Sequence, residues 1–195
     1  MNVAILGATS GMGRALARLM ADRGDRLFLL GRDLDRLEKS AADLRVRTSR
    51  GDVDTPDPVA GLARCDLEDP STFAPALDAA ENALGRLDTV VVTAARFATQ
   101  DALADDPEAA RELSTLNFAN TVGLCEHARH RLLARGGGTL CVFSSVAGDR
   151  GRKPVVIYGA GKAGLSAYLE GLDHRYRAEG LVTVCVKPGF VHTAM

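Results

Sequence analysis

The sequence predicts an α/β domain in which a parallel sheet is covered by helices on both faces. Apolar runs of strand length alternate with longer helical patterns, and six such alternations are typical of parallel strands joined by helices. The runs are almost continuously apolar, as in Val90-Val91-Val92, which suits strands buried on both sides. The expected strands are 3–6, 27–30, 59–63, 89–93, 139–143 and 182–186.

Length and composition indicate a single soluble domain, because 195 residues with 46% hydrophobic side chains can bury a substantial core. The 24 Lys and Arg balance the 25 Asp and Glu, so the total charge indicates neither a nucleic-acid partner nor an anionic membrane. No apolar run approaches the length of a membrane span, and residues 1–6 lack the basic start and the length of a signal peptide. We therefore expect a cytoplasmic protein.

Cysteine and histidine spacing argues against a metal site. The four cysteines lie far apart without a CxxC pair, which favours buried free thiols over a disulfide or zinc framework. His127 and His130 are three apart on one predicted helix and imitate a metal pair, but no third ligand lies nearby in the sequence, so exposed helix positions are the better interpretation. We expect no bound metal.

The first turn is rich in glycine. Gly7, Gly11 and Gly13 lie between strand 3–6 and a helical pattern that continues through Arg14. Glycine lets backbone N–H groups approach a phosphate, and the start of the following helix favours negative charge. The alternative is an ordinary tight turn. The turn thus predicts a phosphate site at the end of the first strand.

Two connections follow from local chemistry. Asp33, just after strand 27–30, is expected to cap the helix that follows. Residues 48–58 combine Gly51, Pro56 and Pro58 with charged side chains, which predicts a long surface loop.

Tyr158 and Lys162 form the chemical centre of the chain. If Tyr158 begins a helix, Lys162 lies one turn further along the same face. A phenol has a pKa of about 10 and is a poor proton donor near neutral pH. A cation at about 4 Å favours the phenolate by only about 1 kcal/mol in water, but by about 4 kcal/mol at an effective dielectric near 20. The pair therefore predicts a general acid in a sheltered cleft.

With Ser145 thirteen residues before Tyr158, and with the Gly7-x-x-x-Gly11-x-Gly13 turn, the chain resembles the short-chain dehydrogenase/reductase family nearly from end to end. The resemblance implies a Rossmann-like doubly wound fold in one domain, residues 1–195, that carries both cofactor and catalytic residues. It also implies hydride transfer between a nicotinamide and a carbonyl or alcohol. The family's catalytic tetrad is matched by Asn117, Ser145, Tyr158 and Lys162.

The resemblance assigns each member of the tetrad a role. Tyr158 would donate a proton to the carbonyl oxygen during reduction, and Ser145 would hydrogen-bond the same oxygen. Lys162 would lower the pKa of Tyr158 and hold the nicotinamide ribose, while Asn117 would hold a water relay to Lys162. The alternatives are a strand-end hydroxyl for Ser145, a solvated charge for Lys162 and a helix-bending polar residue for Asn117.

The same resemblance implies the cofactor contacts, including Asp66 after the third strand for the adenine and a Pro-Gly-x-Val-x-Thr segment that flanks the nicotinamide. The implied set is Gly7, Thr9, Ser10, Gly11, Met12, Gly13, Arg32, Asp66, Leu67, Ala94, Ala95, Tyr158, Lys162, Pro188, Gly189, Val191 and Thr193.

Cofactor choice follows from charge. An acidic residue at the end of the second strand would bind the ribose 2′-OH and repel a 2′-phosphate, but this chain has Gly31 followed by Arg32. A guanidinium binds phosphate in a bidentate manner, so we expect NADP(H) in preference to NAD(H). The alternative is a solvated Arg32 beside Asp33.

Two departures from the family pattern are visible. Thr93-Ala94-Ala95 stands where the family usually has Asn-Ala-Gly, so methyl groups border the nicotinamide ribose. The family also usually continues past Thr193 into a seventh strand and a substrate lid, which are missing here. We expect strand 182–186 to lie at the sheet edge and this form to bind NADPH but turn over poorly, with the natural protein either longer or covered there by a partner.

The substrate and the assembly are less closely defined. Arg150, Arg152 and Lys153 lie between Ser145 and Tyr158 and either recognise an anionic group or form a solvated loop. The family implies a homodimer or homotetramer, and the apolar positions that begin at Leu165 suit either an interface or a core. Two other functions stay open: a catalytically silent NADP(H)-binding sensor, and an epimerase or dehydratase of the family's extended branch.

Overall fold

The fold is built on one parallel sheet of six strands. The computed structural model describes residues 1–9, 11–49 and 56–191. In these ranges the strand order is β3-β2-β1-β4-β5-β6, and every neighbouring pair is parallel. The strands are β1 (Asn2–Leu6), β2 (Arg26–Gly31), β3 (Val59–Arg64), β4 (Thr89–Val92), β5 (Gly138–Phe143) and β6 (Leu181–Val186). All six predicted strands are therefore confirmed, each to within one residue.

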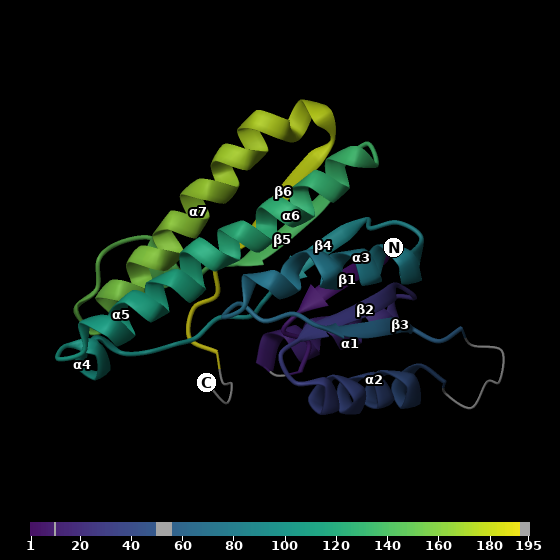
Figure 1. The fold of residues 1–195 in the computed structure, drawn as a ribbon, viewed down its shortest axis with the longest axis horizontal. Helices are drawn as coiled ribbons and strands as arrows, with labels where there is room; N and C mark the ends of the chain where they lie inside the picture. The colour runs from purple at the N-terminus through teal and green to yellow at the C-terminus, as the bar shows by residue number, and fades with distance from the viewer. Residues whose placement is uncertain (10, 50–55, 192–195) are drawn as a thin grey trace.

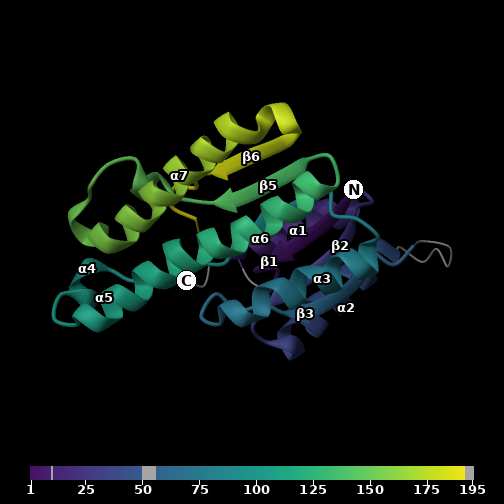
Figure 2. The same ribbon diagram turned by 45° about the horizontal axis from the view of Figure 1, so that its top comes forward.

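Helices cover both faces of the sheet, as predicted (Figures 1 and 2). The helices are α1 (Gly11–Asp22), α2 (Leu34–Ser49), α3 (Phe73–Leu84), α4 (Gln100–Leu103), α5 (Pro107–Ser114), α6 (Thr121–Ala134) and α7 (Val156–Tyr176). The first two pack on one face, and α3, α6 and α7 pack on the other. A π-helical segment, Thr115–Asn120, joins α5 to α6 without a break.

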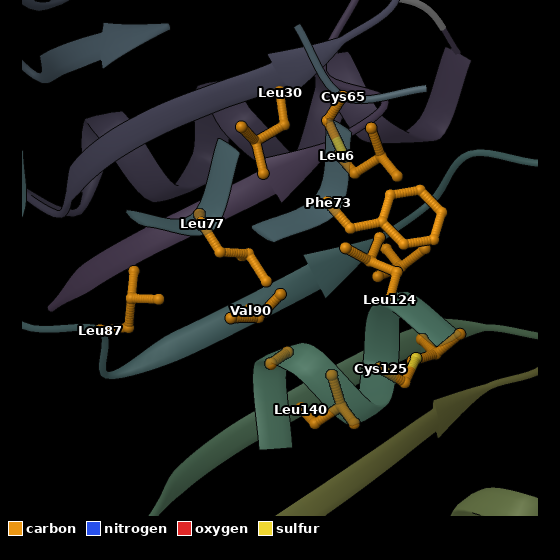
Figure 3. Close-up of a cluster of buried hydrophobic side chains, with 14 of the residues drawn as sticks. Leu6, Leu30, Cys65, Phe73, Leu77, Leu87, Val90, Leu124, Cys125 and Leu140 are labelled. Atoms are coloured by element: carbon orange, nitrogen blue, oxygen red, sulfur yellow. The ribbon is translucent and has the colours of Figure 1, made fainter. Parts of the chain in front are cut away.

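Each strand supplies side chains to two cores. In β1, Val3 and Ile5 pack with α1 and α2, while Ala4 and Leu6 pack with the opposite helix layer, as the period of two along a strand requires. Figure 3 shows the second core, where Phe73 of α3 lies close to Leu6. Burial on both faces explains why the strands read as continuous apolar runs.

The edge strand β6 is less buried than its sequence predicts. On the α7 side Leu181 is fully buried, but Val184, on the other side, is 40% exposed. In the described ranges the core of α1 and α2 reaches β5 only through the half-buried Cys141 and Phe143. The expectation of a buried strand 182–186 is therefore wrong, because none of these five residues is fully buried and only the preceding Leu181 is.

The second helix is longer than expected. Thr48 and Ser49, predicted to open a surface loop, belong to α2, because their hydroxyls donate to the carbonyls of Leu44 (3.1 Å) and Val46 (3.2 Å) within the last turn. Residues 50–55 of that predicted loop lie outside the described residues. At the other end of α2, Asp33 caps the helix as predicted, with its Oδ1 accepting from Arg36 N–H at 3.1 Å.

The cysteines are free thiols, as expected, but only two are fully buried. Cys65 and Cys125 are buried, whereas Cys141 and Cys185 are half-buried. Burial raises the pKa of Cys65 and of Cys125 to about 12 and that of Cys141 to about 11. These three thiols are therefore weak nucleophiles.

Candidate active site

A cleft of about 600 Å³ opens at the carboxyl ends of β1 to β4. It lies where the strand order reverses between β1 and β4, the usual ligand position in an open parallel sheet. The cleft brings together most of the predicted cofactor residues, namely Gly7, Thr9, Gly11, Met12, Gly13, Arg32, Asp66, Leu67, Ala94 and Ala95. Ser10 and Thr193, also predicted, lie outside the described residues.

The glycine turn is built so that side chains cannot fit. Gly7 has a φ of 99°, which disfavours any side chain, and a Cβ on Gly13 would overlap both the Gly7 carbonyl and the Thr93 hydroxyl. The bare backbone thus lines the cleft directly before α1, whose first N–H groups have no partners within the helix. Such a cradle fits the pyrophosphate of a dinucleotide.

Thr93 takes the place at which the family usually has Asn. Its hydroxyl donates to the Leu6 carbonyl at 3.0 Å, which ties the end of β4 to the end of β1. Ala94 and Ala95 then line the cleft with methyl groups, as expected.

A chain of charges crosses one rim of the cleft. Arg32 is 66% exposed and lies 3.8 Å from Glu68, and Arg96 lies 3.6 Å from the same carboxylate oxygen. Arg32 is therefore paired with Glu68 while it stays largely exposed, so the alternative of a solvated Arg32 stays open. Glu68, Arg96 and Arg36 line the cleft as well, and the sequence analysis missed all three. The four-residue spacing from Arg32 to Arg36 was a usable signal for the last of them.

Asp66 is buried at the end of β3, and its carboxylate already accepts hydrogen bonds from neighbouring residues. Its Oδ1 accepts from Glu68 N–H at 3.1 Å, and its Oδ2 lies 3.4 Å from Arg64. Leu67 also lines the cleft, and its carbonyl accepts from Asn120 at 2.7 Å. Both residues thus line the cleft, and the contact of Asp66 with an adenine stays a prediction.

Asn117 is 1% exposed in the π-helical segment and binds the backbone of Arg96 twice. Its Oδ1 accepts from Arg96 N–H at 2.9 Å, and its Nδ2 donates to Arg96 O at 2.7 Å. The amide that was expected to hold a water relay to Lys162 is therefore engaged with the connection that follows β4. A relay to Lys162 stays a prediction.

Tyr158 and Lys162 lie one turn apart near the start of α7, as predicted. Lys162 is only 2% exposed, its Nζ donates to the Phe143 carbonyl at 2.6 Å, and the same Nζ lies 5.8 Å from the centre of the Tyr158 ring. Lys162 is thus not a solvated charge. Buried beneath the phenol, it is fixed by the end of β5.

Ser145 also faces Tyr158. It has extended backbone at the end of β5, and its hydroxyl accepts from Ala147 N–H at 3.1 Å. The same hydroxyl lies close enough to Tyr158 to lower the pKa of the phenol. The hydroxyl, the phenol and the ammonium therefore converge from two elements.

The pKa shifts differ from the expected direction. Burial raises the pKa of Tyr158 and outweighs the effect of the nearby Ser145 hydroxyl, which lowers it. Burial also lowers the pKa of Lys162 to about 8. The expected lowering of the pKa of Tyr158 is thus wrong, because burial of the phenol is the larger effect. A contribution of Lys162 to that pKa stays a prediction.

The segment after β6 runs beside Ser145. The Pro188 carbonyl accepts from Val146 N–H at 3.2 Å, and Ser144 N–H donates to Val186 O at 2.7 Å. Gly189 and Val191 follow directly, although none of the predicted residues 188, 189 and 191 belongs to the lining of the cleft.

The basic loop between Ser145 and Tyr158 was predicted either to recognise an anionic group or to be solvated, and both interpretations stay open. Arg150 and Lys153 are exposed and Arg152 is half-buried, and none of the three lines the cleft.

His127 and His130 are exposed on α6, as expected. Among the described residues, no group of three or more His, Cys, Asp or Glu side chains is placed to hold a metal ion. Within the same ranges, no helix combines the length and apolar character that spanning a membrane requires.

Fold and site together define an α/β protein of the nucleotide-binding Rossmann type that also carries a tyrosine–lysine pair with a buried lysine. A family model described as short chain dehydrogenase matches residues 1–195, so the chain belongs to the short-chain dehydrogenase family. It is an oxidoreductase of the class that acts on alcohol and carbonyl groups.

Three similar proteins illustrate the relationship. An uncharacterized oxidoreductase in the mprA 5′ region of Streptomyces coelicolor is 36% identical and covers 96% of this chain and 71% of its own length. Carbonyl reductase family member 4 of Xenopus tropicalis is 26% identical, and the match covers 98% of this chain and 76% of the relative. A solved short-chain dehydrogenase of Shigella flexneri 2a, in complex with NADP, is 25% identical and has a TM-score of 0.86. The match covers 100% of this chain and 79% of the solved chain.

Proposed function

We propose that the protein is an NADPH-dependent reductase of a small-molecule carbonyl compound. The observation that carries the proposal is buried Lys162 against the ring of Tyr158, with Ser145 nearby, in a chain whose cleft is lined by a glycine turn suited to a dinucleotide. None of these three side chains lines the cleft itself. When bound, the nicotinamide would supply the hydride. A similar protein solved with NADP and a relative named as a carbonyl reductase support the same reaction.

The residues of the chain would supply geometry and a proton. Ser145 would donate a hydrogen bond to the substrate oxygen, and Tyr158 would give that oxygen its proton as the carbonyl becomes an alcohol. Lys162 would stabilise the resulting phenolate and hold the nicotinamide ribose. Because the pKa of Lys162 is about 8, the site holds its cation at neutral pH. Asn117 would serve the site by holding the backbone of Arg96, and a relay to Lys162 would be an additional role.

Preference for NADPH would come from Arg32 at the rim of the cleft. Its guanidinium would bind the 2′-phosphate, and Glu68, now 3.8 Å away, would have to release it. The remaining predicted residues, Ser10, Pro188, Gly189, Val191 and Thr193, would complete the cofactor site. One domain, residues 1–195, would then carry cofactor and catalytic residues together.

The alternative functions are less well supported. A silent NADP(H) sensor would have no use for a buried lysine against a tyrosine ring. An epimerase or dehydratase of the extended branch would carry a GxxGxxG turn, and Ser10 stands here at its middle glycine. We also propose a cytoplasmic location, consistent with the expectation from sequence.

The direct test is a panel of aldehydes and ketones followed by NADPH absorbance, with protein that carries its natural C-terminus. Oxidation of NADPH that depends on the added carbonyl is expected. Tight NADPH binding without turnover on any carbonyl would favour the sensor instead.

The proposed assembly is a homodimer or homotetramer that uses the outer surface of α7 and the π-helical segment. Phe118 is partly exposed there and lies so close to Gly164 that a Cβ at that position would meet its ring at 2.8 Å. In contrast, Leu165, Leu169 and Leu172 of the apolar series on α7 are buried in the protein's own core, so they are not free for an interface. Light scattering at micromolar concentration should give at least twice the monomer mass, and a monomer there would refute the proposal.

A further inference from the structure

Phe97 lies against the tyrosine of the candidate active site. The two ring centres are 5.1 Å apart with an angle of 74° between the planes, an edge-to-face arrangement that aromatic pairs prefer. Phe97 nevertheless keeps 47% of its surface exposed. An apolar ring thus stands next to the proposed proton donor with nearly half of its surface open.

The segment that carries Phe97 is fixed at both ends. On one side Asn117 binds the N–H and the carbonyl of Arg96, at 2.9 and 2.7 Å. On the other side Gln100 Oε1 accepts from the N–H of Ile157 at 3.3 Å, one residue before Tyr158. The ring is therefore held in place relative to Tyr158 by the chain on either side of it. A group fixed in this way can select a ligand by shape at little cost in ordering.

The position of Phe97 marks the change from cofactor to substrate. Ala94, Ala95 and Arg96 line the cofactor cleft, and Phe97 is the next residue along the chain. Its side chain touches the phenol that would meet the substrate oxygen. A group bonded to the carbonyl carbon therefore passes near the open part of a flat, uncharged ring.

We propose that Phe97 determines substrate specificity, by providing the surface on which a flat apolar group next to the carbonyl carbon packs. The substrate class is ketones and aldehydes with an aromatic or planar conjugated substituent. This inference rests on the proposed reductase function and names the substrate class of the same site.

The test compares two methyl ketones of similar size, acetophenone and cyclohexyl methyl ketone, of which only the first carries a flat ring. We measure kcat/KM for both with NADPH in the wild type, in Phe97→Leu and in Phe97→Ala. Leu19→Ala is the control, because Leu19 is an exposed apolar residue on α1 that does not line the cleft. The expected result is a preference for acetophenone of at least tenfold in the wild type and in Leu19→Ala. Both Phe97 variants should lower this preference at least fivefold.

Equal losses on both ketones would overturn the inference, because Phe97 would then only position Tyr158. A wild type that turns over no carbonyl on the wider panel defeats the proposed reductase function instead. The packing surface is then judged by ligand-observed NMR of the two ketones with the NADPH-bound protein. Weaker acetophenone binding in Phe97→Leu supports the inference, and unchanged binding overturns it.

Discussion

The side chain of Asn117 holds the backbone of Arg96 through both its donor and its acceptor, at 2.7 and 2.9 Å. Asn117 is buried in the π-helical segment, and Arg96 belongs to the connection after β4. This pair fixes the chain between the cofactor cleft and Tyr158. Sequence alone indicated Asn117 but not its partner.

Loss of this pair should destabilise the protein and loosen the connection. Asn117→Ala leaves two partly buried backbone groups of Arg96 without partners, so we expect a loss of about 2 kcal/mol in the free energy of unfolding. The amide of Arg96 should also exchange its proton faster. The control is Asn120→Ala in the same segment, which loses one hydrogen bond, to Leu67 O. Urea unfolding and hydrogen exchange measure both effects, and equal losses in the two variants would contradict the special role of Asn117.

Cofactor preference should depend on Arg32 and, in the opposite sense, on Glu68. Arg32→Asp should lower NADPH affinity at least tenfold and reverse or abolish the preference over NADH. Glu68→Gln should increase NADPH affinity, because Arg32 then has no ion pair to break before it binds the 2′-phosphate. Arg47→Asp is the control, since this exposed residue on α2 carries the same charge and lies outside the cleft lining. Fluorescence titration with both cofactors decides, and equal affinities in the wild type would refute the prediction.

Tyr158→Phe should remove turnover and keep cofactor binding. The phenol OH acts on the substrate oxygen, so the rate should fall at least a hundredfold while NADPH affinity stays within a few fold. Lys162→Ala should lower both the turnover rate and the NADPH affinity. Tyr176→Phe removes a phenol OH from the far end of the same helix and should leave the rate unchanged. Residual activity of Tyr158→Phe above about a hundredth of the wild-type rate would be incompatible with a general acid.

Stability should depend on pH through Lys162. Its pKa falls from 10.5 to about 8 on folding, so between these values the unfolded state binds more protons and stability rises with pH. The raised pKa values of Cys65, Cys125 and Cys141 act in the opposite direction above about pH 9. The comparison must therefore be with Lys162→Met.

Relative to that variant, the wild type should gain about 2 kcal/mol in the free energy of unfolding between pH 7.5 and pH 10. Urea unfolding at several pH values measures the difference. A constant difference would mean that Lys162 keeps an ordinary pKa in the folded protein.

The strands and the glycine turn could be predicted because their signals are local. Continuous apolar runs marked all six strands, and most predicted cofactor residues meet in one cleft. Side chains that act across the chain could not be predicted: Glu68 lies between Arg32 and Arg96 only because β2, β3 and β4 end at the same edge. The pKa of Tyr158 was predicted in the wrong direction, because the degree of burial of a phenol cannot be read from sequence spacing.

The strand order also sets the sequence of events in folding. β1 pairs with β2 across about two dozen residues, but its pairing of Val3 with Thr89 must close a loop of more than eighty. During synthesis the first three strands and their glycine turn emerge and can assemble early, whereas Tyr158 and Lys162 dock only after β5 exists to receive them. We therefore expect the glycine turn to form before Tyr158 and Lys162 reach their places. Long-range parallel pairing of this kind is slow, so the part of the chain that carries Tyr158 and Lys162 should fold last.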